Sequence, residues 1–208
     1  MTLRSAEHLA LGYGACVIVE LADPDAALAL LDPIEQQRAG ELPAVRRRDF
    51  IAGRSALHLA LPAAGPILSD DRGAPVLPAG WVGSISHKGA LAAALVAPVG
   101  AGRVGLDLEV AAPPRHDIAA RILTPREQAQ LPDRGRAVTL RFSIKEAIYK
   151  ALDPYLHRYV SFLEVELDFE GDQVAVTTAL PFAIEAAWRE HAGHWLTTAR
   201  ARPVSNKS

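Results

Sequence analysis

Residues 104–110 constrain the fold most, because they form an apolar run that contains two carboxylates, Asp107 and Glu109. The run predicts a β-strand, and successive side chains of a strand point to opposite faces. Asp107 and Glu109 therefore lie together on one face, while Leu106 and Leu108 lie on the other. Because unpaired carboxylates are costly in apolar surroundings, we interpret this face as half of a metal site.

A second stretch, residues 142–150, has the spacing of a helix. Glu146 and Lys150 lie one turn apart in it and therefore share a helix face. If this helix packs near the end of the strand, Glu146 joins the two strand carboxylates and the Lys150 ammonium lies beside them. Three carboxylate ligands, completed by waters and substrate phosphates, suit Mg²⁺. If the two segments meet in this way, Asp107, Glu109 and Glu146 offer a set of ligands that Mg²⁺ accepts.

Both stretches also have simpler interpretations that the residues leave open. The two strand carboxylates suit the exposed face of an edge strand, since a single Asp-x-Glu pattern is weak evidence for a metal. Ser143 and Glu146 fit a capping box, in which the glutamate only serves a helix start. Lys150 would then be an i, i+4 partner that contributes about 0.3 kcal/mol. A helix start at Ser143, however, would interrupt a strongly helical window without any other signal for a break.

Composition narrows the class of protein. The chain has 208 residues, half of them hydrophobic, which is enough for one large domain or two small ones. Its formal net charge of -2 gives no electrostatic reason to expect broad binding to nucleic acid. The single cysteine, Cys16, cannot form an internal disulfide, and its apolar surroundings predict a buried thiol in a reducing compartment.

The sequence contains no stretch of the roughly 18 to 20 consecutive apolar residues that a membrane span needs. Residues 9–16 are faintly similar to a lipoprotein signal, but Glu7 and His8 stand where such signals have positive charge. Glycines also interrupt the short apolar run. We therefore expect a cytoplasmic protein without a membrane span.

Turn formers and hydrophobic periodicity divide the first half of the chain into helices and strands. Asp32, Pro33 and Glu35 mark a helix start with a capping arrangement. Arg47 and Arg54 lie seven residues apart and share one face of the next helix, where they form either a solvated basic face or a phosphate contact. The expected elements are a strand at 15–21, a helix at 44–61, a loop at 68–78 and paired strands at 81–87 and 91–96.

The second half of the chain has the same kinds of elements. Residues 124–127 repeat the helix start of residues 32–35. A long helix is predicted at 136–152, ending before Pro154 because proline disfavours a helical residue in front of it. The other expected elements are a helix at 125–131, a half-exposed strand at 160–169, strands at 173–179, 182–189 and 194–201, and a disordered tail at 203–208.

Both halves therefore combine helices with a mostly antiparallel sheet, which is an α+β fold. The glycine-containing segment 98–103 is the best boundary between them. We predict two pseudo-symmetric lobes, residues 1–102 and 103–202, although no sequence identity between them is visible. A cleft between such lobes is a usual place for a small-molecule site, so we expect the active site there.

Several motifs together resemble the 4′-phosphopantetheinyl transferases, and more closely the long monomeric type found with surfactin and enterobactin synthases. Their joint order and spacing carry the resemblance, which spans residues 46–168. The motifs are Ser86 with His87, Gly-Leu-Asp-Leu-Glu at 105–109, Phe-Ser-Ile-Lys-Glu-Ala at 142–147 with Lys150, Phe-Ile-Ala-Gly-Arg at 50–54, and the loop through Pro75.

The resemblance implies an enzyme that transfers the 4′-phosphopantetheine arm of coenzyme A to a serine of an acyl or peptidyl carrier protein and releases 3′,5′-ADP. Carried over by position, Asp107, Glu109 and Glu146 would hold Mg²⁺ against the pyrophosphate of coenzyme A. Lys150 would contact that pyrophosphate. Asp107, Glu146 and Lys150 would thus be the catalytic residues, with Glu146 as the acceptor of the serine proton.

The resemblance also implies residues that bind coenzyme A itself, among them Ser86 and His87 for the 3′-phosphate and the loop proline for the adenine. Two positions depart from the family pattern. Lys88 follows the histidine where the family often has serine, threonine or cysteine. Ala74 stands where a basic residue is frequent, so we expect Arg72 to substitute. The assigned residues are Arg47, Arg54, Arg72, Pro75, Ser86, His87, Lys145 and Lys150.

Carrier proteins present an acidic helix around the modified serine, so the resemblance implies a complementary surface with arginines and apolar residues. We predict that surface in residues 115–136, which contain Arg121, Leu123, Arg126 and Leu131. The family type also implies a monomer. These motifs do not encode whether a siderophore, polyketide, nonribosomal peptide or fatty-acid pathway is served.

Two other functions fit parts of the sequence. A metal-dependent phosphoesterase or nuclease would use the same three carboxylates, but a nuclease favours a broader basic surface than this composition provides. A non-catalytic module that binds coenzyme A or a carrier protein would need the same binding residues without any transfer. Cleavage of nucleic acid would identify the first, and an unchanged mass of the carrier protein would identify the second.

Overall fold

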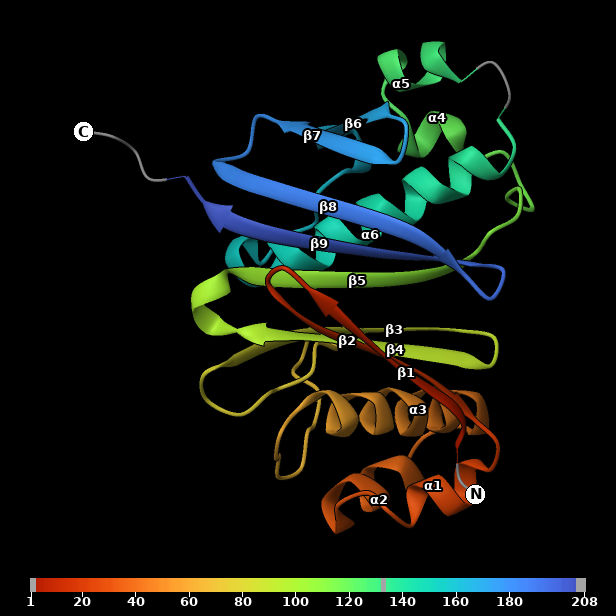
Figure 1. Ribbon diagram of the computed structural model, residues 1–208, viewed down its shortest axis with the longest axis vertical. Helices are drawn as coiled ribbons and strands as arrows, with labels where there is room; N and C mark the ends of the chain where they lie inside the picture. Colours follow the sequence, from red (N-terminus) through yellow and green to blue (C-terminus); the bar gives the residue numbers. More distant parts are fainter. Residues whose placement is uncertain (1–2, 132–133, 205–208) are drawn as a thin grey trace. The chain divides into compact units, whose positions relative to one another are not determined.

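The computed structural model describes residues 3–131 and 134–204. The chain forms two compact units, Met1–Ala101 and Gly102–Ser208, here named the N-terminal unit and the C-terminal unit. Each unit contains helices and antiparallel strands, so the predicted α+β class is confirmed (Figure 1). The expectation that the active site lies between two lobes stays a prediction.

The N-terminal unit contains a four-stranded antiparallel sheet with the order β1-β2-β4-β3. All side chains of β4 from 91 to 97 are buried, as expected for an alanine-rich strand that is covered on both faces. The sequence reasoning does not predict the edge strand β1, whose alternation of apolar and polar residues is weak. The strands are β1 Leu3–Leu11, β2 Gly14–Leu21, β3 Trp81–Lys88 and β4 Leu91–Pro98.

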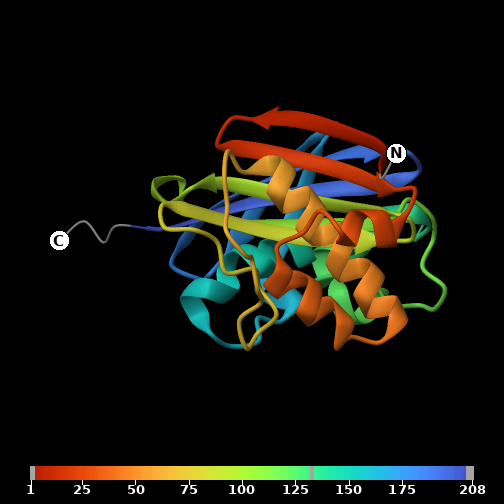
Figure 2. The ribbon, with the colours of Figure 1, turned by 90° about the horizontal axis from the view of Figure 1, so that it is seen from below.

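Helix α3, Ala44–Ala60, packs against strands β2, β3 and β4 of this sheet (Figures 1 and 2). Its Ile51 and Leu57 join Val17 and Val96 in one buried core, and burial of apolar surface, at about 25 cal/mol per Å², holds the helix on the sheet. No helix in the described part of the chain is both long and apolar enough for a membrane span. The shorter elements are α1 Pro24–Leu28, α2 Pro33–Gly40 and the 3₁₀ turn η1 Val99–Ala101.

The capping arrangement predicted at the start of α2 is confirmed, and its glutamate also ties the helix to distant segments. Asp32 caps the helix, and Glu35 accepts a hydrogen bond from the backbone amide of Asp32. Glu35 is completely buried and also accepts from the amide of Ile67, at 2.8 Å. Nε2 of His58 on α3 lies 2.9 Å from the same carboxylate. One carboxylate thus joins α2, α3 and the loop after α3.

The C-terminal unit contains a three-stranded antiparallel sheet with the order β5-β9-β8 and a separate β6-β7 hairpin. The long helix α6 packs against β5, β8 and β9, and its Ile144, Ile148 and Leu152 lie in the core. The strands are β5 Arg103–Val110, β6 Val165–Glu170, β7 Gln173–Thr178, β8 Phe182–His191 and β9 His194–Pro203. The helices are α4 Ala119–Ile122, α5 Pro125–Gln130 and α6 Arg136–Leu156, with a 3₁₀ turn, η2, at Phe162–Glu164.

The C-terminal unit repeats the carboxylate arrangement of the N-terminal unit. Glu127, in the capping box of α5, is completely buried and accepts hydrogen bonds from the amides of Thr124 and Leu167. Lys145 of α6 takes the place of the histidine, with its Nζ 2.7 Å from Oε2 of Glu127. In both units a buried arginine lies one helical turn before this basic residue. The two units therefore share a packing arrangement that sequence identity does not reveal.

Helix α1 is not among the predicted elements, and one predicted helix limit is wrong. Helix α1 begins at Pro24, where the Asp23 side chain accepts hydrogen bonds from the amides of Asp25 and Ala26. Helix α6 does not stop before Pro154 but continues to Leu156. A proline this close to the helix end removes a single backbone hydrogen bond, and Tyr155 and Leu156 pack against the core, which offsets that cost.

The strand predicted at 160–169 begins later, at Val165, because Ser161 caps the 3₁₀ turn in front of it. The tail predicted at 203–208 is also revised, since Pro203 belongs to β9 and residues 205–208 lie outside the described residues. The other predicted helices and strands are confirmed to within two residues at each end.

Candidate active site

Helix α6 crosses strand β5 at very close range, and Gly105 makes this approach possible. A Cβ atom at Gly105 would overlap the carbonyl oxygen of Ala147 and would lie 2.7 Å from the backbone nitrogen of Ala151. Any larger residue would therefore push the helix away from the strand. Because side chains alternate along a strand, Asp107 and Glu109 lie on the same face of β5 as Gly105. The close contact thus brings these carboxylates to α6.

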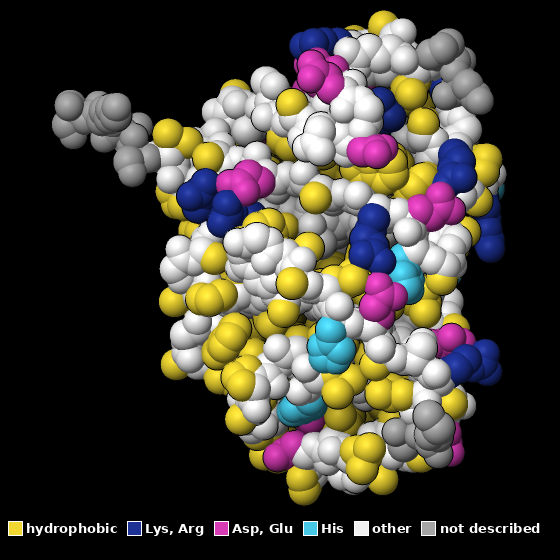
Figure 3. Space-filling model, viewed as in Figure 1, with side chains coloured by type: hydrophobic (Ala, Val, Ile, Leu, Met, Phe, Trp, Pro, Cys, Tyr) yellow, Lys and Arg dark blue, Asp and Glu magenta, His cyan; other side chains and the backbone are white. Residues whose placement is uncertain are grey.

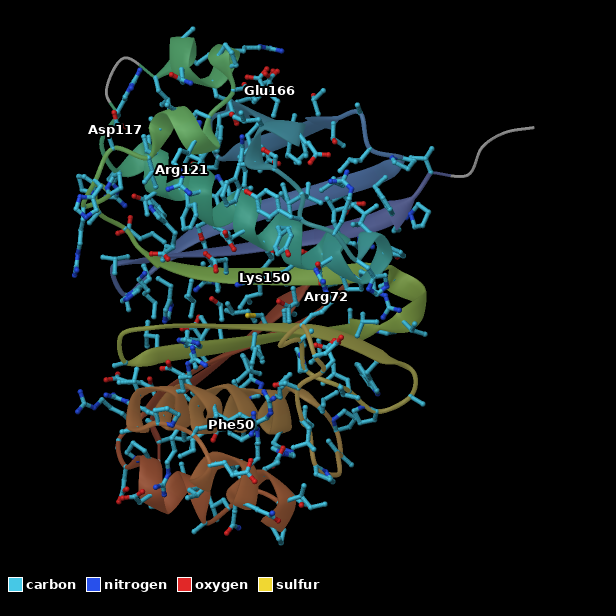
Figure 4. The ribbon with its side chains drawn as sticks, turned by 180° about the vertical axis from the view of Figure 1, so that it is seen from behind. Phe50, Arg72, Asp117, Arg121, Lys150 and Glu166 are labelled. Atoms are coloured by element: carbon cyan, nitrogen blue, oxygen red, sulfur yellow. The ribbon has the colours of Figure 1, made fainter. Side chains whose placement is uncertain are left out.

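Asp107 is buried at this contact, with 6% of its surface exposed, and α6 supplies partners for both of its carboxylate oxygens. Nζ of Lys150 donates to Oδ1 at 2.8 Å, and Oγ of Ser143 donates to Oδ2 at 2.8 Å. Lys150 also donates to the carbonyl oxygen of Leu106, at 2.9 Å. Figure 4 shows Lys150 where α6 lies along β5. The ion pair offsets part of the cost of burying the carboxylate.

Ser143 lies in the interior of α6, which begins at Arg136, so the capping-box interpretation of Ser143 and Glu146 is wrong. Oγ of Ser143 lies 3.0 Å from Oγ1 of Thr197 on β9. Thr197 in turn donates to the backbone carbonyl oxygen of Ser143, at 2.9 Å. Neither side chain has any exposed surface. The Ser143 hydroxyl therefore contacts the Asp107 carboxylate, and the Thr197 hydroxyl contacts Ser143.

Glu146 shares the electrostatic environment of the two strand carboxylates. Burial raises the pKa of Glu146 above the ordinary glutamate value, and the charge of Asp107 raises it further. Lys150 opposes this rise, and Glu109 adds to it. Since these charges act on one another, the structure brings the three predicted acids and Lys150 into one region of the C-terminal unit.

The donor set of this region suits a hard divalent cation. Asp107, Glu109 and Glu146 offer carboxylate oxygens, which are ligands that Mg²⁺ prefers. Burial and then the charge of Asp107 raise the pKa of Glu146, and a bound cation would favour its charged form. In the described residues, no three His, Cys, Asp or Glu side chains are already arranged as a complete metal site. The assignment of Mg²⁺ to the three acids therefore stays a prediction.

The prediction that Lys145 binds coenzyme A is wrong. Its side chain is 1% exposed, and its ammonium donates to the carbonyl oxygens of Ile122 and Phe162 as well as to Glu127. Burial lowers the pKa of Lys145, and the Glu127 carboxylate opposes this shift. Neighbouring residues on a helix point about 100° apart, so Lys145 leaves α6 in a different direction from Glu146. It holds α4, α5 and η2 to α6.

Ser86 and His87, which are predicted to hold a phosphate, lie near the end of β3 in the N-terminal unit. Ser86 is buried, whereas the side chain of His87 is 49% exposed. Nδ1 of His87 lies 3.5 Å from Oδ1 of Asp49 on α3, a contact that orients the imidazole. Phosphate binding by Ser86 and His87 stays a prediction.

Arg54 is buried and anchors a loop, which corrects the prediction that it contacts the nucleotide. Only 1% of its surface is exposed. Its Nε donates to the carbonyl oxygen of Ile67, and one Nη donates to Oγ of Ser69 at 2.8 Å. Burial lowers the pKa of Arg54 to about 10, with the Glu35 charge opposing. Because Glu35 also accepts from the Ile67 amide, Arg54 and Glu35 hold this residue from both sides. The guanidinium lies 4.4 Å from the ring centre of Phe50, which Figure 4 shows on α3.

The loop predicted at residues 68–78 is confirmed, and Asp70 shapes it. Oδ1 of Asp70 accepts from the amide of Arg72, at 2.9 Å, and from the amide two positions later, at 2.8 Å. Pro75 forms an isolated bridge with Ser69. Arg72 is exposed on this loop. The nucleotide contacts assigned to Arg72 and Pro75 stay predictions.

Arg47 and Arg54 are predicted to share one face of α3, but their side chains differ in exposure. The Arg47 side chain is 39% exposed and lies 3.4 Å from a carboxylate oxygen of Asp25 on α1. Arg54 turns inward to the loop that it anchors. A pocket of about 330 Å³ lies beside Arg47 and is lined by Pro24, Asp25, Leu42, Ala44, Arg47, Arg48 and Ile51. Of the two arginines, Arg47 is therefore the one with a surface for an anion.

Of the residues predicted to form the carrier-protein surface, the two arginines are exposed, whereas Leu123 is buried. Leu123 is 1% exposed and packs in a small core, so its assignment to the surface is wrong. Arg121 is exposed on α4, as Figure 4 shows. Arg126 is also exposed, but it pairs with Glu166 at 3.3 Å and with Asp168 at 2.8 Å. On the side of the molecule that Figure 3 shows, basic and acidic side chains lie next to one another rather than in a broad patch of one sign.

The sequence reasoning missed Ser143 and Thr197 as residues of the site. Ser143 lies seven residues before Lys150 and therefore shares its helix face, a spacing that could have identified it. Thr197 lies opposite Asp107 in the pairing of β5 with β9. A single sequence carries no signal for that register, because strands far apart in the chain can pair in several ways.

Two family models match this chain, one in each half. Residues 35–97 match the family model described as the 4′-phosphopantetheinyl transferase N-terminal domain, and residues 103–202 match the 4′-phosphopantetheinyl transferase superfamily. Among solved structures, Thermotoga maritima holo-[acyl-carrier-protein] synthase (AcpS) matches 50% of this chain and 64% of its own, with a TM-score of 0.40 and 24% identity.

Curated relatives agree with the family models. The chain is 34% identical over 146 residues to the 4′-phosphopantetheinyl transferase Npt of Nocardia iowensis, covering 66% of each protein. It is 38% identical over 116 residues to enterobactin synthase component D of Escherichia coli O157:H7, covering 51% of this chain and 54% of that protein. Identity to the 4′-phosphopantetheinyl transferase PptT of Mycobacterium tuberculosis is 33% over 168 residues, or 76% of this chain and 74% of that protein. The two family models and these relatives show that the chain belongs to the 4′-phosphopantetheinyl transferase family.

Proposed function

We propose that this protein transfers the 4′-phosphopantetheine arm of coenzyme A to a serine of an acyl or peptidyl carrier protein, in a Mg²⁺-dependent reaction that releases 3′,5′-ADP. One observation carries the proposal. Lys150, which is partly exposed, and the buried Asp107 form an ion pair where α6 crosses β5, and Glu146 lies close enough for their charges to shift its pKa. Cationic and carboxylate groups that meet in this way suit the chemistry of a diphosphate.

Asp107, Glu109 and Glu146 are the residues that would hold Mg²⁺. When bound, this ion supplies positive charge to the oxygens of the pyrophosphate. The buried Asp107 and the partly exposed Glu109 lie on one strand face and are good donors for it, because the fold already holds them together before coenzyme A binds. Their common face is fixed by the contact of Gly105 with α6.

The proposed reaction makes one bond and breaks one bond at the same phosphorus atom. The serine oxygen attacks the phosphorus that carries the pantetheine arm, and the bond from that phosphorus to the bridging oxygen breaks. The electron pair of that bond leaves with 3′,5′-ADP. Negative charge therefore grows on the bridging oxygen, and we assign the Lys150 ammonium to donate to it.

Glu146 is our candidate acceptor of the serine proton. Its raised pKa makes it a stronger base than an ordinary glutamate. Burial and the neighbouring carboxylates cause this shift, so the same environment that suits a metal also prepares the base. Replacement of Glu146 by glutamine should therefore lower turnover more than it lowers coenzyme A affinity.

In the N-terminal unit, we assign His87, Ser86 and Arg47 to the 3′-phosphate and nucleotide of coenzyme A, and the loop with Arg72 and Pro75 to the adenine. The half-exposed imidazole of His87 and the partly exposed side chain of Arg47 support these assignments. Both side chains already have acidic neighbours, and a more highly charged phosphate can compete with a single exposed carboxylate for them.

We assign the exposed arginines Arg121 and Arg126 to the carrier protein. The existing contacts of Arg126 with Glu166 and Asp168 are exposed ion pairs, which are worth at most about 1 kcal/mol and can be exchanged for an acidic carrier helix. Charge reversal at Arg121 should therefore weaken carrier modification and leave coenzyme A affinity unchanged. We also propose that the protein acts as a monomer in the cytoplasm, since a buried Cys16 that forms no disulfide suits a reducing compartment.

The test combines coenzyme A, MgCl₂ and a panel of apo-carrier proteins. We expect the mass of at least one carrier to increase by one phosphopantetheine group, with an equal amount of 3′,5′-ADP released and with neither product when a chelator removes the metal. Coenzyme A binding without any mass change would identify a non-catalytic binding module instead. Cleavage of DNA or RNA with no carrier modification would identify a nuclease.

A further inference from the structure

We propose that Ser143 and Thr197 are positioning residues that hold the Asp107 carboxylate in the orientation used by the site. This inference rests on the proposed function, since it concerns the ligand that Asp107 provides. It starts from the three buried side chains of Asp107, Ser143 and Thr197, which come from β5, α6 and β9. The proposed mechanism uses the first of them and leaves the two hydroxyls without a role.

The hydrogen bonds among these side chains have one consistent direction. An ionised carboxylate is an acceptor only, so the single hydroxyl proton of Ser143 goes to Oδ2 of Asp107, at 2.8 Å. The Thr197 hydroxyl also has one proton, which it can donate to Oγ of Ser143, at 3.0 Å, or to the backbone carbonyl oxygen of Ser143, at 2.9 Å. The Ser143 rotamer that this proton arrangement favours therefore points its hydroxyl at Asp107.

The backbone fixes the distance between these groups. Asp107 lies directly opposite Thr197 in the pairing of β5 with β9, so the strand register sets their separation. Ser143 lies one turn before Ala147, whose carbonyl oxygen contacts Gly105 of β5. Both helix and strand are therefore packed without space for Ser143 to move away. The hydroxyl pair is part of the same close crossing that forms the site.

Two donors on different oxygens restrict how the carboxylate turns. Lys150 holds Oδ1 and Ser143 holds Oδ2, each at 2.8 Å. A carboxylate with one donor can rotate about its last bond, which is a soft torsion, whereas one with two opposed donors is held in its plane. Each oxygen keeps a further lone-pair direction, which leaves Asp107 able to bind a cation. Such neighbours of a metal ligand typically contribute about 10- to 100-fold to metal affinity.

Ser143→Ala removes the donor to Asp107, and Thr197→Val removes the second hydroxyl while keeping the shape of the side chain. Thr139→Val is the matched control. Thr139 is also a nearly buried threonine, and its hydroxyl also donates to a backbone carbonyl, that of Ala112, at 2.7 Å. Thr139 lies one turn before Ser143 on α6. The hydrogen bond that Thr139→Val removes goes to the Ala112 carbonyl oxygen and does not involve Asp107.

The measurement is the affinity of the folded protein for Mn²⁺ in the presence of coenzyme A, by isothermal titration calorimetry, together with thermal unfolding. We expect Ser143→Ala to weaken Mn²⁺ binding about 10- to 100-fold. Thr197→Val should weaken it by a smaller factor, and Thr197→Ser should restore it. The two threonine-to-valine variants should lose similar stability, but Thr139→Val should keep the wild-type Mn²⁺ affinity.

The proposal is overturned if Ser143→Ala and Thr197→Val bind Mn²⁺ like the wild type while Asp107→Asn loses it. It is also overturned if Thr139→Val weakens Mn²⁺ binding as much as Thr197→Val, because loss of stability would then explain both. A wild-type protein that does not bind Mn²⁺ at all would reject the metal site of the proposed function, and this inference with it. The first two outcomes leave the proposed function intact.

Discussion

Replacement of Lys145 by methionine distinguishes a structural role of this lysine from the coenzyme A contact that its motif implies. Methionine keeps most of the apolar stem but removes the ammonium. The Glu127 carboxylate would then stay buried, with no exposed surface, beside the unpaired carbonyl oxygens of Ile122 and Phe162. Breaking a buried pair from one side typically costs about 3–5 kcal/mol. At about 2–4 °C per kcal/mol for a chain of this size, the melting temperature should fall by about 6–20 °C.

Thermal unfolding and urea titration would measure this loss, and calorimetry at a temperature where the variant is folded would measure its coenzyme A affinity. We expect the affinity to stay within about twofold of the wild type. Lys150→Met is the contrasting variant, because the Lys150 side chain is 27% exposed and bonds to Asp107 of the proposed site. It should lose carrier modification with a smaller change in melting temperature.

A second substitution tests the electrostatic explanation directly. Adding Glu127→Gln to Lys145→Met removes the uncompensated buried charge, so the double variant should be more stable than Lys145→Met alone. The reasoning is refuted if Lys145→Met unfolds like the wild type but binds coenzyme A at least tenfold more weakly. That result would show that Lys145 contacts coenzyme A, as the sequence motif indicates.

Three further predictions concern other parts of the structure. Gly105→Ala should lower both stability and transfer, because its Cβ would meet the Ala147 carbonyl; wild-type melting and turnover in this variant would argue against the close crossing of α6 and β5. The raised pKa of Glu146 means that its contribution to stability is present below the ordinary glutamate pKa and is lost as the pH rises through the raised value. Without divalent metal, Glu146→Gln should therefore raise the melting temperature at about pH 8 but not at about pH 4. Equal shifts of the melting temperature at both pH values would contradict the raised pKa. Burial raises the pKa of Glu35, but the hydrogen bonds from His58 and from the Ile67 amide, with others, outweigh burial and lower it. The stability that ionised Glu35 gives the fold is therefore present above the ordinary carboxyl pKa and is lost as the pH falls through the lowered value. Glu35→Gln should flatten this acid-induced loss in a pH series of melting temperatures, and an unchanged series would speak against the role of Glu35.

Local sequence signals predicted the elements that local physics determines. The capping arrangements at Asp32 and Thr124 begin helices as expected, because the capping side chain and the amides that it bonds are neighbours in the chain. The alternation around Asp107 correctly indicates a strand with both acids on one face. The helix end predicted before Pro154 is wrong, since packing of the two residues after it outweighs the tendency of proline to end a helix.

The errors at the site come from directions and partners that one sequence does not contain. Lys145 is adjacent to Glu146 in the chain, but helix geometry sends it to a different side of α6. Arg54 has the spacing from Arg47 that places both on one helix face, yet its guanidinium donates a hydrogen bond to the carbonyl oxygen of Ile67, thirteen residues further along. Thr197 becomes part of the site only through the register of β9 against β5. Each of these facts depends on tertiary packing rather than on local pattern.

The most direct test of the account is the position of the ion itself. A crystal of the protein with Mn²⁺ and coenzyme A, measured for anomalous scattering, would locate the metal without ambiguity. We predict a single anomalous peak at coordination distance, about 2.2 Å, from oxygens of Asp107, Glu109 and Glu146 and from the pyrophosphate. A peak bound elsewhere, or one that Glu146 does not contact, would contradict the claim that these three acids form one metal site.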